Sequence, residues 1–251
     1  MKSLQLPDKY HDIKKSIQEI FHGSKGRYGY HRVTFTLRNR GYQINHKTVQ
    51  KLMKELGLVC QVRMKKYTSY KGEVGRIAPN LLNRDFKVQK ANQKWVTDVT
   101  EFSLFGQKLY LSPILDLFNG EIISYSITKR PNYGQIQIML DRAFEKHINL
   151  EGLILHSDQG WQYQMKAYQG QLKSKGILQS MSRKGNCLNN AVMENFFGLL
   201  KSELLYLQTF DNIEHFIREL EEYIYWYNTY RIKSKLKGLS PVDYRIQSLV
   251  A

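Results

Sequence analysis

Three carboxylates stand in sequence contexts that could bring them together for chemistry. Asp98 lies in WVTDVT, a β-branched run typical of a strand, and Asp158 ends the apolar run LILHSD. Glu194 lies in NNAVMENFFGLLKSELL, which is typical of a helix, and 59 and 35 residues separate the three acids. Two strand aspartates and a helical glutamate can converge on two divalent cations, which activate an oxygen nucleophile and stabilise the leaving oxygen of a phosphodiester.

The expected ions are two Mg²⁺ (or Mn²⁺), because carboxylates are hard oxygen ligands. A carboxylate inside an apolar strand also needs a cation or hydrogen-bond donors to offset its desolvation. Asp116 competes for the same role, but it lies beside the Asn119-Gly120 turn, so a structural hydrogen-bonding role is expected. His156 is expected to pack or to position a phosphate, since a two-metal site needs no protein base.

The charge distribution indicates a polyanionic partner. The net charge is +16; residues 1–90 carry 20 Lys/Arg against 6 Asp/Glu, whereas residues 91–251 carry 18 against 16. The basic first third therefore favours DNA as partner. No apolar run reaches the roughly 18–20 residues of a membrane span, and no lipid-binding stretch or signal sequence is evident. We expect no membrane partner and a cytoplasmic location, associated with the nucleoid when DNA is bound.

The basic region has the pattern of a small helical domain over residues 1–59. Helices are predicted at 11–21, at 31–41 with Gly41 at its end, and at 46–57 with Asn45 as N-cap. This succession is typical of a helix-turn-helix, with a generic helical hairpin as the alternative. The residues predicted to contact DNA here are Arg27, Tyr28, Arg32, His46, Lys47 and Lys51. Residues 60–93, with eight Lys/Arg, are interpreted as a basic linker.

Residues 94–206 are predicted to form the catalytic core. Three consecutive strands are expected in 93–104, 108–118 and 121–127, the last two joined by the Asn119-Gly120 turn. A helix at 132–148, a strand at 153–157, a helix near 164–175, a strand at 177–182 and the Glu194 helix follow. The order β-β-β-α-β-α-β-α predicts an α/β, ribonuclease-H-like core with a mixed five-stranded sheet, preceded by the all-α domain. Residues 207–251 are expected to be a C-terminal helical extension.

Several residues around the acids are candidates for DNA contact. Asn190, Glu194 and Lys201 share one face of the predicted helix, so Lys201 either contacts a phosphate or is one more solvated lysine. The loop before this helix contributes Arg183 and Lys184. Trp161 and Tyr163 beside Asp158 could stack on a base or pack in the core.

The chain resembles the OrfB (integrase-core) transposases of the IS-three family of bacterial insertion sequences. The resemblance is carried by GRYGYHRVTFTLRNRGYQINHKTVQKLMKELGL, WVTDVTEF, LDLFNGEIISYSI, HSDQGWQY, GNCLNNAVMENFFGLLKSE and YIYWYNTYRIKSKLKGLSPVDYR. It implies a DDE transposase related to retroviral integrases, with Asp98, Asp158 and Glu194 as catalytic residues and Lys201 contacting DNA. It further implies cleavage at terminal inverted repeats, strand transfer into target DNA, assembly of several copies on DNA, and an upstream OrfA partner or frameshift fusion.

Two features depart from related patterns. Asn189 stands where the family usually has an acid, and Cys60 is the only cysteine before the core, so a retroviral-type zinc module cannot be built. Two rival functions remain at this point. A nuclease of the same fold would hydrolyse DNA without joining it, and a non-catalytic DNA-binding protein would show metal-independent affinity and no products.

Overall fold

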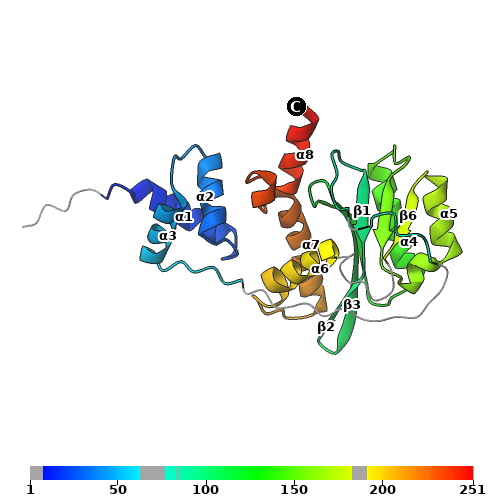
Figure 1. Ribbon diagram of the computed structural model, residues 1–251. Helices are drawn as coiled ribbons and strands as arrows, with labels where there is room; N and C mark the ends of the chain where they lie inside the picture. Colours follow the sequence, from blue (N-terminus) through cyan, green and yellow to red (C-terminus); the bar gives the residue numbers. More distant parts are fainter. Residues whose placement is uncertain (1–7, 63–76, 84, 183–190, 251) are drawn as a thin grey trace, which may run out of the picture. The chain divides into compact units, whose positions relative to one another are not determined.

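The chain forms two compact units. The computed structural model describes residues 8–62, 77–83, 85–182 and 191–250 (Figure 1). One unit contains residues 1–63 together with 230–240, and the other contains residues 64–229 together with 241–251. Of the helices in the described ranges, none is both long enough and apolar enough to cross a membrane.

The first unit is built on three helices, α1 (His11–Gly23), α2 (Tyr30–Asn39) and α3 (His46–Glu55). Each helix buries an apolar stripe, represented by Ile17, Val33 and Leu52. The Asn45 side chain accepts a hydrogen bond from the Lys47 amide at 2.9 Å, which confirms the predicted N-cap of α3. The three predicted helices are therefore present, with ends within a few residues of those expected.

A segment from the C-terminal part of the chain completes this unit. The Tyr28 hydroxyl donates to the Tyr230 carbonyl at 2.8 Å and accepts from the Ile232 amide at 2.9 Å. The Asn39 side-chain amide donates to the Gly238 carbonyl at 2.9 Å. The segment includes the 3₁₀ helix η4 (Ser234–Leu236). Within the C-terminal helical extension expected over 207–251, residues 230–240 thus group with the N-terminal helices.

The second unit contains a mixed sheet of six strands. They are β1 (Lys94–Thr97), β2 (Thr100–Leu104), β3 (Gln107–Asp116), β4 (Ile122–Thr128), β5 (Ile154–Ser157) and β6 (Leu178–Met181). The β3–β4 hairpin turns at Gly120, where φ is +69°, as the Asn119-Gly120 signal predicted. β1 pairs with β5 and β5 with β6 in parallel, whereas β2, β3 and β4 are antiparallel neighbours.

The sixth strand arises because the first expected strand is interrupted. Thr97 in β1 lies opposite Ile114 of β3, and Thr100 in β2 lies opposite Leu111. Both pairs belong to one continuous register, while β4 pairs with β3 along the other edge. β1 and β2 therefore act as a single strand broken at residues 98–99, and the predicted count of five is corrected to six.

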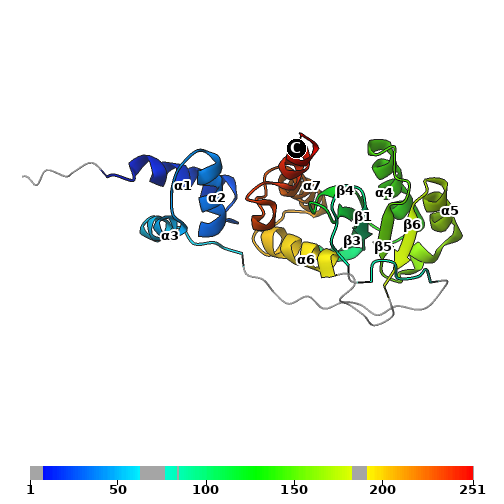
Figure 2. The same cartoon turned by 45° about the horizontal axis from the view of Figure 1, so that its top comes forward.

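Helices cover both faces of the sheet (Figures 1 and 2). Neighbouring strand residues point to opposite faces, so Trp95 and Val96 belong to different apolar clusters. The Trp95 cluster contains residues of α4 (Tyr133–Lys146) and α5 (Lys166–Ser174). The Val96 cluster contains residues of α6 (Ala191–Leu200), η3 (Lys201–Leu205, a π-helical turn) and α7 (Ile213–Thr229). The described residues of this unit also form η1 (Trp161–Gln164) and α8 (Pro241–Val250).

Part of the predicted linker belongs to this unit as packed structure. Leu82 is buried in the Val96 cluster, and the Leu81 amide donates to the Ser180 hydroxyl of β6 at 2.9 Å. Residues 77–83 therefore pack against the sheet next to β6 and are not an unpacked linker.

Candidate active site

Asp98 lies at the interruption between β1 and β2. The register of β1 and β2 places Pro113 of β3 opposite Asp98, and proline has no amide hydrogen to donate to a neighbouring strand. The Thr97 hydroxyl instead donates to the Pro113 carbonyl at 2.9 Å. The Asp98 carboxylate accepts from the Val99 amide at 2.7 Å, which fixes one of its oxygens. The break in the ladder thus releases Asp98 from regular pairing and holds it in place.

Asp158 lies beside Asp98 by strand register. Parallel pairing sets Val96 opposite His156, and continuing that register by two residues sets Asp98 opposite Asp158. Both aspartates directly follow the carboxyl ends of adjacent strands, which is where parallel sheets generally place functional groups. The Asp158 carboxylate accepts from the Gly160 amide at 2.8 Å. The spacing of 59 residues is therefore what this pairing requires.

Glu194 lies in the first turn of α6, and its side chain is partly buried. The helix buries Met193, Phe196 and Phe197 against the sheet, which orients the glutamate relative to β1. The negative charge of Glu194 acts on Asp98. The structure therefore brings the three predicted acids into one electrostatic neighbourhood.

The acids are held in an environment that disfavours their charged forms. Burial raises the pKa of Asp98 well above its usual range, and the charges of Asp158 and Glu194 raise it further, against the opposing effect of the Val99 amide. Burial also raises the pKa of Asp158, partly opposed by the Gly160 amide, and burial raises the pKa of Glu194. Carboxylates in this state gain from a nearby cation.

The donor chemistry at this point fits a divalent metal ion. Asp98 and Asp158 each use one oxygen for a backbone amide, and both offer hard carboxylate ligands suited to Mg²⁺. Within the described ranges, no group of three or more His, Cys, Asp or Glu side chains is close enough to hold one ion. The two aspartates contribute carboxylate oxygens at this point, and the charge of Glu194 on α6 acts on Asp98.

The side chains behind the aspartates are structural. His156 is fully buried, burial lowers its pKa to about 4, and its Nδ1 lies 2.8 Å from the Ser180 hydroxyl. The predicted packing role is confirmed, and a phosphate-positioning role does not agree with a side chain closed to solvent. Tyr163 is also fully buried and packs edge-on against Tyr168, whereas Trp161 is 53% exposed. Core packing is therefore confirmed for Tyr163 alone.

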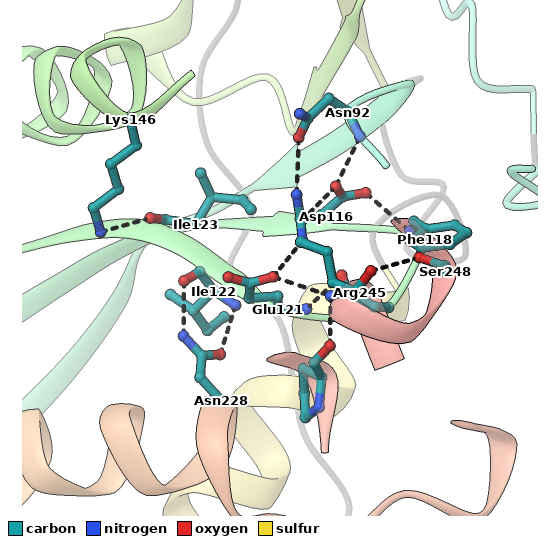
Figure 3. Close-up of polar contacts among 12 residues, drawn as sticks. Asn92, Asp116, Phe118, Glu121, Ile122, Ile123, Lys146, Asn228, Arg245 and Ser248 are labelled. Atoms are coloured by element: carbon teal, nitrogen blue, oxygen red, sulfur yellow. Dashed lines mark hydrogen bonds and ion pairs between the residues drawn. The ribbon is translucent and has the colours of Figure 1, made fainter. Parts of the chain in front are cut away.

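Asp116 has the structural role that was predicted (Figure 3). It is fully buried and accepts from the Asn92 amide, the Phe118 amide and Arg245 Nη2, each at 2.9 Å. Arg245, on α8, also forms an ion pair with Glu121 at 2.6 Å. No local sequence pattern indicated the role of Arg245, because Asp116 and Glu121 are more than 120 residues away.

The predicted DNA-contacting residues of the core are only partly described. Lys201 is partly buried, with Nζ 5.8 Å from the centre of the Phe102 ring. Burial lowers the pKa of this ammonium group, while the charge of Glu101 raises it. Arg183, Lys184, Asn189 and Asn190 lie outside the described residues.

The predicted contacts of the N-terminal unit separate into buried and exposed residues. Arg27 and Tyr28 are only 5% and 4% exposed, so the expectation that they face DNA is corrected: they belong to the interior of this unit. Arg32 is partly buried, with its guanidinium carbon 5.6 Å from the centre of the Tyr28 ring. Lys47 and Lys51 are exposed on α3.

An aromatic stack that was not predicted from the sequence lies at the start of α2 and α3. His46 is partly buried, and its ring lies 5.4 Å from that of His31 and 6.2 Å from that of Tyr30. Lys47 and Lys51 line an adjacent pocket of about 510 Å³. The adjacent rings of Tyr30 and His31 could have indicated a stack, but the third ring, that of His46, comes from another helix.

Three family models match the chain. Residues 8–66 match an HTH-like domain, residues 88–187 match an integrase core domain, and residues 194–249 match a second integrase core domain model. The first match supports the helix-turn-helix interpretation of the basic region over a generic helical hairpin.

Curated relatives cover nearly the whole chain. It is 58% identical over 248 residues to the putative transposase InsK for insertion sequence element IS150 of Escherichia coli, covering 99% of this chain and 88% of that protein. It is 55% identical over 219 residues to an uncharacterized transposase-like protein of Haemophilus influenzae, covering 86% of this chain and 100% of the relative.

The fold of the second unit is also found among solved structures. The HTLV-2 integrase catalytic core domain, solved in complex with magnesium, aligns with a TM-score of 0.52 at 19% identity, covering 63% of this chain and 99% of that chain. This likeness confirms the ribonuclease-H-like fold class. The curated relatives show that the chain belongs to the IS-three family of insertion-sequence transposases with an integrase core.

Proposed function

We propose that this transposase cuts DNA strands at the ends of its insertion sequence and joins the freed 3′ ends to target DNA, using Asp98, Asp158 and Glu194. The observation that carries the assignment is the β1–β5 register, which sets Asp98 opposite Asp158 at the carboxyl ends of adjacent strands. The effect of Glu194 on the pKa of Asp98 supports its inclusion as the third acid.

Two divalent cations, Mg²⁺ or Mn²⁺, would be held by the aspartates with Glu194. The all-oxygen donor set and the raised pKa values of the three carboxyl groups support this choice. When bound, such ions activate an oxygen nucleophile and stabilise the leaving oxygen in an in-line displacement at phosphorus.

The protein's own part is to hold the carboxylates in place. The Val99 amide binds one carboxylate oxygen of Asp98, and the Gly160 amide binds one carboxylate oxygen of Asp158, so both side chains are oriented by the backbone. The Thr97 hydroxyl ties the strand to Pro113 immediately before Asp98. This preorganisation matters because a ligand misplaced by about 1 Å can reduce a reaction rate roughly 100-fold.

DNA binding is assigned mainly to the N-terminal unit. Exposed Lys47 and Lys51 on α3 are suited to phosphate contacts, and Lys201 is proposed to contact DNA next to the carboxylates. The relatives are named as transposases for insertion sequences, which supports the terminal inverted repeats of such an element as the substrate. Assembly of several copies on DNA and cooperation with an upstream OrfA partner or fusion remain part of this proposal.

A strand-transfer assay tests the proposed function. The chain is incubated with a labelled, pre-cleaved element end and Mg²⁺ or Mn²⁺, alongside the Asp98→Asn and Glu194→Gln variants. We expect joined products that disappear in both variants, while DNA affinity measured in EDTA stays near the wild-type value because the basic unit dominates binding.

Each rival function predicts a different result. Hydrolysis without joining would support a nuclease of the same fold. Retained strand transfer by purified Asp98→Asn protein would overturn the assignment of the acids. A protein that binds DNA with equal affinity in EDTA and gives no product, alone or as the fused longer form, would be a non-catalytic binder.

A further inference from the structure

Residues 230–240 are a strongly basic part of the N-terminal unit that lies outside its three helices. The segment contains Arg231, Lys233, Lys235 and Lys237 and has no acidic residue. Arg231 is buried and Lys233 partly buried, whereas Lys235 and Lys237 are exposed. All charged side chains of this segment are therefore positive. In the sequence, the segment follows the helix-turn-helix by about 180 residues.

The backbone of this segment is fixed into a closed loop. The Lys233 amide donates to the Leu239 carbonyl at 3.0 Å, and the Gly238 amide donates to the Lys233 carbonyl at 3.1 Å. The Tyr28 hydroxyl holds the start of the segment, and the Asn39 side chain holds its end. A loop ordered in this way loses little conformational entropy when it binds a partner.

Lys237 occupies a backbone conformation that lysine rarely adopts. Its φ is +57°, in the left-handed region that glycine and asparagine tolerate best. The next residue, Gly238, has a packing reason for its identity, since a Cβ there would lie 2.7 Å from Phe35 Cδ1. The exposed Lys237 side chain has no comparable packing reason. A lysine at a strained position points to a use for its charge.

We propose that this loop contacts the phosphate backbone of DNA through Lys235 and Lys237, as a second DNA-binding element of the N-terminal unit. Neither lysine forms an ion pair within the described part of the chain, so both ammonium groups are available. Two lysines on a fixed loop match the regular negative charge of a duplex. The inference rests on the proposed function for the identity of the partner.

The salt dependence of DNA binding tests the loop directly. The full chain and the Lys235→Gln/Lys237→Asn double variant are titrated in EDTA with a duplex carrying the element's terminal repeat and with a scrambled duplex of equal length. The slope of log Kobs against log[NaCl] should decrease in magnitude by about 1.8, or about 0.9 per lost phosphate contact. At about 0.1 M salt we expect affinity to fall roughly tenfold or more on both duplexes, since phosphates carry no sequence.

Two controls separate this effect from misfolding and from net charge. Asn is well suited to the left-handed position, so the thermal midpoint of Lys237→Asn should equal or exceed that of the wild type. Lys173→Gln removes one exposed lysine from α5 and should leave the slope unchanged. Loss of affinity in a variant with an undiminished thermal midpoint would support the loop contact.

Other outcomes overturn the inference in distinguishable ways. Unchanged affinity and slope in the double variant would exclude the phosphate contact while leaving the proposed function intact. A loss confined to the terminal-repeat duplex, with the slope unchanged, would exclude phosphate recognition by these lysines. A wild-type chain that binds neither duplex would instead contradict the proposed function itself.

Discussion

Two groups of buried carboxylates lie near opposite ends of β1, and their surroundings differ. Asp116 lies opposite Trp95 near the start of the strand, and its carboxylate is bound by two backbone amides and by Arg245. Asp98 directly follows the strand, with one backbone amide and the negative charges of Asp158 and Glu194 around it. Arg245 is the counter-cation of Asp116 and Glu121. In the other group, burial and the charges of Asp158 and Glu194 raise the pKa of Asp98.

The difference distinguishes a structural from a functional use of the same side chain. Arg245 neutralises Asp116 and Glu121 and thereby holds α8 to the β3–β4 hairpin (Figure 3). The pKa values of Asp98, Asp158 and Glu194 are instead raised, which is expected of carboxyl groups that gain from an external cation. The electrostatic surroundings, rather than the presence of an acid in a strand, separate the two roles.

Catalysis should show the largest contrast between the two groups. We expect Asp158→Asn and Glu194→Gln to reduce strand transfer by at least about 10³-fold, because each removes a ligand of the reacting assembly. Asp116→Asn should retain activity per folded molecule. Initial rates on a pre-cleaved end, normalised to the folded fraction, measure this contrast. Equal losses of strand-transfer rate in Asp158→Asn, Glu194→Gln and Asp116→Asn would contradict the division into catalytic and structural carboxylates.

Removing Arg245 from its ion pairs with Asp116 and Glu121 should strongly destabilise the fold. Arg245→Met leaves Asp116, which is fully buried, without its cation, so we expect the free energy of unfolding to fall by about 3–5 kcal/mol. The double variant Asp116→Asn/Arg245→Met should recover part of this loss, since the fully buried charge of Asp116 is then absent and only the partly buried Glu121 still lacks Arg245. Urea denaturation of the three proteins checks the prediction, and a loss below about 1 kcal/mol for Arg245→Met would contradict it.

The Thr97 hydroxyl should matter more for activity than for stability. Thr97→Val removes the bond to the Pro113 carbonyl, with an expected loss of about 1–3 kcal/mol. Displacement of Asp98 should lower strand transfer by up to about 100-fold. Ser124→Ala is the matched control, because it also removes a buried hydroxyl bond to a carbonyl, at Met139. Similar rates in the two variants would show that Thr97 does not position Asp98.

The raised pKa of Asp98 should make the stability of the protein depend on pH. The folded chain holds the Asp98 proton more tightly than the unfolded chain, so ionisation reduces the free energy of unfolding as pH rises from about 4 through the raised pKa. Asp98→Asn should therefore become progressively more stable than the wild type as pH rises. Asp116→Asn should be less stable than the wild type at neutral pH, because it weakens an ion pair.

Urea denaturation in EDTA from pH 4 to pH 8 measures both variants. Added Mg²⁺ should then raise the thermal midpoint of the wild type more than that of Asp98→Asn. A pH-independent difference between Asp98→Asn and the wild type would contradict the raised pKa of Asp98.

The sequence by itself determined the elements and the three acids. The α3 helix follows from its apolar period and the Asn45 cap, and the β3–β4 hairpin follows from Asn119-Gly120, because these signals are local. The spacing of Asp98, Asp158 and Glu194, with the family resemblance, identified the candidate site. The same local pattern could not show that Tyr28 is buried, since its partners lie near residue 230.

The tertiary structure decided the features that depend on distant partners. Pro113 lies opposite Asp98 only after β1 and β3 have paired, and that pairing interrupts the first strand. Arg245 compensates Asp116 only when α8 packs on the hairpin, and residues 230–240 join the N-terminal helices through Tyr28 and Asn39. Hydrogen bonding and electrostatics act through space, so these roles were fixed by which residues became neighbours on folding.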